Sequence, residues 1–152
     1  MKNTDFDFLA GRWTGRQRRL VEVLAGRDEW YEFDATLECW VLLDGMATFD
    51  VLRAPERDLE GITLRLFDPK EQTWRIWWAS KTSGGQLDVP VVGRFVDGVG
   101  TFECDDTWNG TPIRVQYRWS DVDTDHPRWQ QGFSTDGGRT WEVNWTARFS
   151  RA

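Results

Sequence analysis

The stretch WYEFDATLECWV, residues 30 to 41, alternates apolar and polar side chains over most of its length. Glu32, Asp34, Thr36 and Glu38 form one set. The set between them consists of Tyr31, Phe33, Ala35, Leu37, Cys39 and Val41. Successive side chains of a β-strand point to opposite faces, so this period of two predicts a strand with one face in a core and the other in water.

The same alternation returns in residues 113–120 and 141–149. Dipeptides that tolerate the positive φ angles of tight hairpins separate such segments: Asp44-Gly45, Asp97-Gly98, Asn109-Gly110 and Asp136-Gly137. We expect about ten strands, at roughly 12–24, 30–43, 46–54, 60–68, 73–80, 90–97, 99–107, 112–121, 127–135 and 139–151. Thr4 can cap a single helical turn before Gly11, and no other segment has a helical period.

Ten hairpin-linked strands with one apolar face predict an all-β fold, an antiparallel up-and-down barrel. Closure removes the edge strands that a flat sheet would expose to aggregation, and the N-terminal turn would plug one end. A two-sheet sandwich is the alternative. Because 152 residues suffice for one good core, we expect a single domain over residues 1–152.

Charge and composition exclude several classes of function. The net charge of -6 comes without a basic stripe, which argues against nucleic acid as a partner. The first residues lack the apolar core of a signal peptide and no stretch approaches the length of a membrane span, so we expect a cytoplasmic protein without membrane association. Cys39 and Cys104 fall in alternating segments and are expected as buried thiols. Eleven tryptophans indicate an interior, or a pocket, built from large rings.

The segment FLAGRWTG, residues 8 to 15, contains Gly11-Arg12-Trp13 and resembles the G-x-W start of lipocalins and other calycins. Together with FDPKEQTW at 67–74 and the C-terminal SxDGGxTWExNW, it is similar to nitrobindin-type and related uncharacterised bacterial families. The resemblance spans the chain and implies a barrel with an internal cavity. It also implies that Trp13 packs at the closed end against an arginine of the last strand, either Arg148 or Arg151.

In nitrobindins the resemblance further implies a haem held by an axial histidine. Here the one histidine, His126, falls in the polar loop DTDHPRW, and Gln17 stands where that pattern has glycine, so we expect no haem. Asp121 to Asp125 begin like a calcium loop, but His126 and Gly132 occupy positions that need glycine and glutamate. We therefore expect no metal and no other cofactor.

The stretch FSTDGGRTW, residues 133 to 141, fits the Asp box that recurs in sialidases and other β-propellers. A propeller needs several copies at blade spacing, and this chain has one. We interpret it as a hairpin in which Ser134 and Asp136 bind backbone amides and Trp141 anchors the turn in the core. The residues with expected structural roles are Gly11, Trp13, Arg148, Ser134, Asp136 and Trp141.

Alternation also selects candidate ligand-binding residues. If Phe49 and Val51 face inward, so does Arg53, and Arg19 shares the side of Trp13 and Gln17. The predicted inward set is Arg19, Tyr31, Arg53, Trp74, Trp78, Asp106, Tyr117, Trp129 and Gln131. Arginines beside aromatic walls can orient an anionic or carbonyl-bearing aromatic ligand. Alternatively they reach solvent or pair with Asp106, and a β-bulge would reverse the pattern locally.

Three functions remain open. The favoured one is binding of a small apolar or aromatic molecule in a Trp-lined cavity. The second is an enzyme on the same scaffold, a cyclase, isomerase or lyase, with Asp106 or Tyr117 as acid or base and Arg53 stabilising an oxyanion. The third is an interaction protein with a solid core. Trp30, Trp40 and Trp77 lie opposite their strands' main apolar sets and suggest a partner surface, most simply a homodimer.

Overall fold

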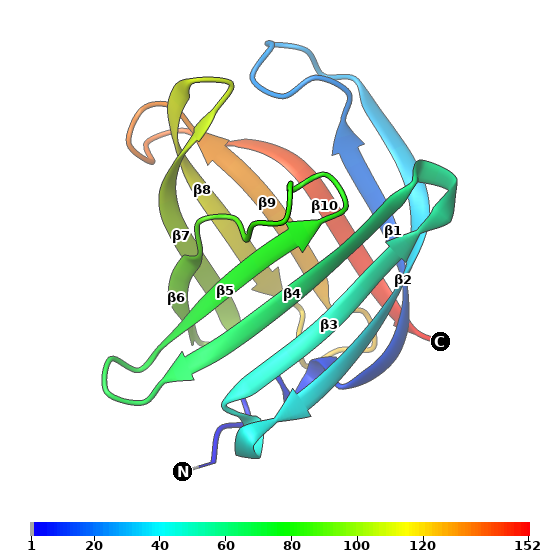
Figure 1. Cartoon of the computed structure of the whole chain (residues 1–152), viewed down its shortest axis with the longest axis vertical. Helices are drawn as coiled ribbons and strands as arrows, with labels where there is room; N and C mark the ends of the chain where they lie inside the picture. Colours follow the sequence, from blue (N-terminus) through cyan, green and yellow to red (C-terminus); the bar gives the residue numbers. More distant parts are fainter. Residues whose placement is uncertain (1) are drawn as a thin grey trace.

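Ten antiparallel strands close into one barrel in the computed structural model, which describes residues 2–152 (Figure 1). The strands are β1 (Gly11–Leu20), β2 (Trp30–Leu42), β3 (Ala47–Ala54), β4 (Leu59–Asp68), β5 (Thr73–Ser80), β6 (Val91–Val96), β7 (Val99–Trp108), β8 (Thr111–Ser120), β9 (Arg128–Ser134) and β10 (Glu142–Arg151). Each strand pairs with its neighbours in sequence, and β1 pairs with β10. The predicted up-and-down barrel is therefore confirmed over the sandwich.

Three short 3-10 turns complete the fold: η1 (Asp7–Leu9), η2 (Leu43–Gly45) and η3 (Pro55–Arg57). The predicted N-terminal turn is η1, but Thr4 does not cap it: Phe6 is the N-cap residue, no side chain caps the turn, and only the backbone carbonyl of Thr4 accepts from the amide of Asp7, at 3.1 Å. Phe6 and Leu9 are at most 1% exposed, and the Phe6 ring meets Trp74 edge-on with centroids 4.8 Å apart. These side chains seal one end of the barrel, which we call the closed end.

Trp13 ties β1 to this seal. Its Nε1–H donates to the carbonyl of Leu9 at 2.9 Å, and the guanidinium carbon of Arg151 lies 3.8 Å from the centroid of its ring. Arg151 takes this position because it is the direct partner of Trp13 in the β1–β10 register. The expectation for Arg148 is wrong, since that side chain alternates to the outside and is exposed. Gly11, at φ +105°, is adjacent: a Cβ there would lie 2.9 Å from Arg151.

In β3 the face that points into the barrel is the opposite of the one predicted, and the neighbouring β4 turns Thr63 and Arg65 inward. Asp50 and Leu52 are buried, whereas Arg53 is exposed and donates to Glu60 on the outside at 2.9 Å. The prediction that Arg53 faces inward is therefore wrong. Both faces of these strands carry apolar residues, so their alternation does not identify the inner side.

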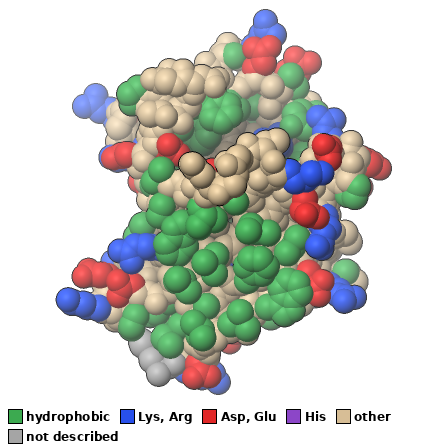
Figure 2. Space-filling model, in the orientation of Figure 1, with side chains coloured by type: hydrophobic (Ala, Val, Ile, Leu, Met, Phe, Trp, Pro, Cys, Tyr) green, Lys and Arg blue, Asp and Glu red, His purple; other side chains and the backbone are tan. Residues whose placement is uncertain are grey.

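The outward side chains of β2 to β5 form an apolar surface. In register, Trp40 lies beside Phe49, Phe49 beside Leu64, and Leu64 beside Trp77. Figure 2 shows hydrophobic side chains gathered on this side, over β3 to β5. We call this surface the outer apolar face: Trp40, Phe49, Val51, Ile62, Leu64, Leu66 and Trp77. Trp30 is ten residues from Trp40 on β2, packs against Arg18 and is not part of it.

Candidate functional site

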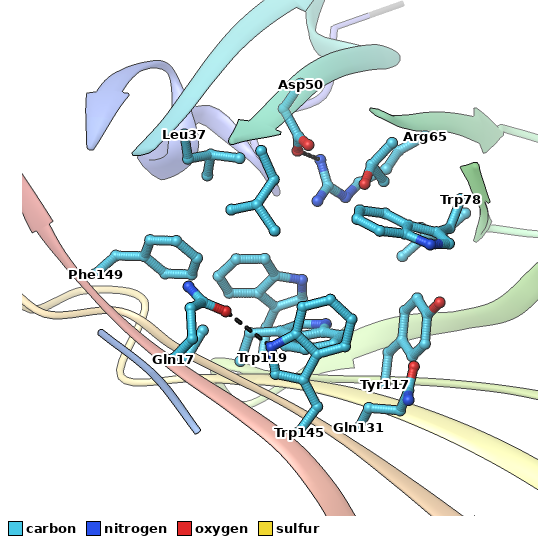
Figure 3. Close-up of a pocket in the computed structure, with 15 residues that line it drawn as sticks. Gln17, Leu37, Asp50, Arg65, Trp78, Tyr117, Trp119, Gln131, Trp145 and Phe149 are labelled. Carbon is cyan, nitrogen blue, oxygen red and sulfur yellow. Dashed lines mark hydrogen bonds and ion pairs between the residues drawn. The ribbon is translucent and has the colours of Figure 1, made fainter. Parts of the chain in front are cut away.

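Two neighbouring cavities occupy the interior between the closed end and the opposite, open end. The inner chamber has a volume of about 70 Å³ and the outer chamber, towards the open end, about 400 Å³. Both are lined by Trp78, Tyr117, Gln131 and Trp145, so the two chambers adjoin along this wall (Figure 3). Together they have the size of a site for a small organic molecule.

Tryptophan rings build the common wall. The ring of Trp145 stands edge-on to Trp78 at 5.9 Å and to Trp129 at 5.3 Å, centroid to centroid. Gly61 on β4 makes room for Trp78, because a Cβ at that position would lie 2.0 Å from its ring. Such edge-to-face contacts stabilise rings beyond their burial and keep the wall rigid.

A buried ion pair closes the inner chamber towards the N-terminal turn. Arg65 donates to the carboxylate of Asp50 at 2.6 Å and to the hydroxyl of Thr48 at 3.0 Å. Both charged side chains are at most 5% exposed. The guanidinium carbon of Arg65 also lies 5.0 Å from the ring centroid of Phe6. Burial raises the pKa of Asp50, and the charge of Arg65 opposes that rise.

Three buried side-chain nitrogens of residues 2–152 have no hydrogen-bond partner in the protein: Gln17 Nε2, Arg65 Nε and Asn144 Nδ2. Gln17 and Arg65 line the inner chamber, and Asn144 lines the outer one. All three side chains are at most 4% exposed. Buried polar groups without partners are rare, because each costs the free energy of its lost hydration.

A β-bulge places Asn144 inside. The register between β9 and β10 shifts between Val143 and Trp145, so that Asn144 and Trp145 are both buried. The shift also overturns the prediction for Trp141, which was expected to start the inward face. A Cβ on Gly132 would meet the Trp141 ring at 3.7 Å, and Gly132 alternates with chamber-lining Gln131 and Phe133. Trp141 therefore covers the outer side of β9.

Charged groups lie along the outer chamber. The guanidinium carbon of Arg19 lies 4.2 Å from the ring centroid of Trp145. Asp88 and Asp106 line the same chamber, and burial together with the charge of Asp106 raises the pKa of Asp88. Burial raises the pKa of Cys104 to about 12 and that of Tyr117 well above its ordinary value. At neutral pH both therefore stay protonated.

The loop 81–90 connects β5 to β6 (Figure 1), and its residues Asp88 and Val89 line the outer chamber. Strands β5 and β6 pair over Trp74 to Ile76, and beyond this point the amide of Asp88 donates to the carbonyl of Trp78 at 2.8 Å. Gly84 and Gly85 adopt positive φ angles in open surroundings. This corner of the wall is held by fewer ladder bonds than the rest of the barrel.

Six of the nine predicted ligand residues line the chambers: Arg19 and Asp106 the outer one, Trp129 the inner one, and Trp78, Tyr117 and Gln131 both. Trp74 instead lies at the closed end, where its Nε1–H donates to Asp5 at 3.0 Å. Tyr31 stacks on Arg57 at 4.1 Å, away from both chambers. Arg53 is outside the barrel.

The chamber residues that sequence reasoning did not select include Gln17, Asp50, Arg65, Asn144 and Trp145. The available signal for Gln17 was its place on the apolar side of β1 beside Trp13. Nothing comparable marked Asp50 and Arg65, because the apolar residues of β3 and β4 lie on the outer face.

The Asp box forms the β9–β10 turn. Ser134 Oγ donates to Asp136 at 2.7 Å and accepts the amide of Gly138 at 2.9 Å, while Asp136 accepts the amides of Arg139 and Thr140. These bonds, those of Thr140 foremost, hold the pKa of Asp136 well below its usual value. The stretch therefore fixes the turn beside the open end.

The haem of nitrobindins does not fit this interior. His126 lies in the β8–β9 loop, with Nδ1 3.0 Å from Ser150 Oγ, and it lines neither chamber. Within residues 2–152, no cluster of three or more His, Cys, Asp or Glu side chains is arranged to hold a metal ion. Cys39 and Cys104 are free thiols.

Comparison with known proteins gives no assignment: no protein-family model matches the chain, and no curated protein matches it. In the part of the chain that the structure describes, no helix has the length and apolar character to cross a membrane.

Proposed function

We propose that the protein binds a small, largely apolar or aromatic molecule inside the barrel. The observation that carries this proposal is the pair of adjoining chambers, about 70 Å³ and 400 Å³, with a common wall of tryptophan and tyrosine. Interiors of proteins are normally packed to crystal density, so space of this size between rigid rings favours a ligand over a solid core.

The same geometry weakens the enzyme alternative. Arg53 lies outside the barrel and is out of reach of an oxyanion within the chambers. Tyr117 has a raised pKa because it is buried, so its phenol does not act as a base at neutral pH. Asp106 lines the outer chamber, but Arg53, the residue expected to act with it, lies on the outside of the barrel.

A neutral fluorescent probe, N-phenyl-1-naphthylamine, tests the binding function. We expect its emission to rise on addition of the protein. Val115→Trp should abolish that rise, because Val115 lines the outer chamber and the larger ring fills it. Val96→Trp is the matched control, since Val96 is 61% exposed on the outside. Absence of probe binding to the unchanged protein, or equal binding to both variants, would contradict the proposal.

We also propose that the outer apolar face binds a second copy of this chain. Strands lie about 4.8 Å apart and alternate residues of a strand about 6.8 Å, so each outward side chain covers roughly 33 Å² and the face roughly 230 Å². That area can form the apolar centre of a standard interface, which buries about 800 Å² per partner including its polar rim. The face is flanked at one end by the Arg53–Glu60 pair and at the other by Arg75–Asp68. Because each end carries both signs, a two-fold copy meets no net like charge.

Sedimentation analysis tests the dimer. Trp40→Glu places a charge in the outer apolar face and should convert the protein to a monomer. Trp30→Glu is the matched control, because Trp30 also faces outward but lies against Arg18, outside that face. A monomeric unchanged protein, including one that takes up a different partner chain through this face, would overturn the proposal.

For compartment, we propose the cytoplasm. The support is that both cysteines are free thiols, as is usual where glutathione keeps thiols reduced. Alkylation of protein unfolded directly from its host should modify both Cys39 and Cys104. A product with neither cysteine modified would contradict the proposal.

A further inference from the structure

The polarity of the inner chamber is fixed by two side chains. Arg65 Nε can only donate a hydrogen bond, whatever its surroundings. Gln17 accepts from Trp145 Nε1 at 2.8 Å through Oε1. An indole N–H is a donor only, so this contact sets the orientation of the amide and leaves Gln17 Nε2 as the free end (Figure 3). Both unpartnered atoms are therefore donors.

We propose that the ligand presents a neutral acceptor oxygen of the carbonyl class to Gln17 and Arg65, with the rest of its body extending into the outer chamber. This inference rests on the binding function proposed above and specifies the chemistry of the ligand's inner end.

The volumes agree with such a division of the ligand. A water molecule takes up about 30 Å³ in the liquid, so the inner chamber of about 70 Å³ holds a group of only a few heavy atoms. The outer chamber of about 400 Å³ has room for one or two fused rings, and its wall combines aromatic and aliphatic side chains with polar and charged ones. Asn144, in that outer chamber, supplies a further donor towards a second polar atom on the body.

The charges favour a neutral oxygen over a carboxylate. Asp50 already neutralises Arg65 at 2.6 Å. Over both chambers, two cations, Arg19 and Arg65, are set against three acids, Asp50, Asp88 and Asp106. An entering carboxylate would lose its hydration and then lie beside Asp50, whereas a carbonyl accepts from the same donors without that repulsion.

Three naphthalenes of nearly equal shape test the inference by displacement of N-phenyl-1-naphthylamine: 2-acetylnaphthalene, 2-ethylnaphthalene and 2-naphthoate. We expect the ketone to displace the probe at a concentration about tenfold lower than either of the others, as a paired buried donor predicts. Equal displacement by the ketone and the hydrocarbon would mean that the donors do not meet the ligand. Stronger displacement by 2-naphthoate would mean an anion site. Either result overturns the inference and leaves the binding function intact.

A substitution locates the effect. Gln17→Met keeps the length of the side chain and removes its donor, so affinity for the ketone should fall about tenfold while that for 2-ethylnaphthalene changes less than about twofold. Gln130→Met is the matched control, because Gln130 lies on the outer side of β9. Equal losses for both ligands would assign Gln17 a role in shape alone and overturn the inference. Retained binding of N-phenyl-1-naphthylamine shows that the variant is folded. If the variant does not fold, displacement by the three naphthalenes still tests the inference on the unchanged protein.

Discussion

The closed end and the inner chamber treat buried polar groups in opposite ways. At the closed end, Trp13 donates to Leu9 and Trp74 donates to Asp5. In the inner chamber, Gln17 and Arg65 hold donors with no partner among residues 2–152. Because an unmade buried hydrogen bond destabilises the fold, the contrast separates a region built for stability from the one that we propose binds a ligand.

The largest expected effect lies at the closed end. Trp13→Ala removes a buried ring, its bond to Leu9 and its stack on Arg151, and should lower the free energy of unfolding by about 5 kcal/mol. Urea denaturation measures this change. Because the Trp13 ring does not line a chamber, we expect the folded fraction of this variant to bind N-phenyl-1-naphthylamine with an affinity within about twofold of that of the unchanged protein. A larger loss of affinity would contradict the separation between the closed end and the chambers.

Arg65→Met should lower the free energy of unfolding by about 3–4 kcal/mol, because it leaves the carboxylate of Asp50 buried without its partner. The double variant Arg65→Met/Asp50→Leu should recover most of that loss, since no buried charge remains. Denaturation of both variants in parallel provides the measurement. A double variant as unstable as the single one would show that packing, rather than charge, dominates this contact.

Gln17→Met separates the two regions further, because we expect it to change ligand affinity while its effect on the free energy of unfolding is small. The change removes an unpartnered donor and the acceptor for Trp145, and these losses oppose each other, so unfolding should shift by less than about 1 kcal/mol. Ligand affinity is its main readout, as described above. A loss of stability comparable to that of Trp13→Ala would place Gln17 with the structural residues.

The smallest expected effect concerns the turn at the open end. The hydrogen bonds of Asp136 hold its pKa below the ordinary aspartate value of 3.8 in the folded protein. Its contribution to stability is therefore present above that value and is lost as the pH falls through the lower folded pKa. The stability difference between the unchanged protein and Asp136→Asn should narrow on acidification from about pH 5 to pH 2. A difference independent of pH would contradict this.

Much of the architecture could be predicted, because alternation and turn dipeptides report directly on hairpins. The barrel and its plug follow from such local signals, whereas the position of Trp13 was expected from the resemblance of residues 8–15 to the start of calycins. The inner side of β3 and β4 could not be predicted, since Phe49 and Leu64 are apolar but belong to the outer apolar face. A prediction from alternation alone places the more apolar face of a strand in the core. In β3 that rule predicts Arg53 inside, whereas the structure has Asp50 inside.

The bulge at Val143 to Trp145 hid a second part of the site. Because of a single extra residue in β10, the side chain of Asn144 points inward and that of Trp141 lies on the outer side. No residue type in the segment predicts this shift of register. Gln17 was visible in the alternation of β1, but an unpartnered donor is a property of three-dimensional surroundings. The ligand's proposed chemistry therefore needed the structure.

The seam between β1 and β10 has a consequence for synthesis of the chain. Trp13 on β1 lies opposite Arg151 on β10, so this pair of strands cannot form until β10 has been synthesised and has left the ribosome. Until then β1 and each newest strand present open edges to the cell, where neighbouring chains can pair with them. Joining residues this distant also slows folding, because the entropy of the intervening chain must be lost first. The pairing of β10 with β1 is thus the step that removes the open strand edges and, with them, the main route to aggregation.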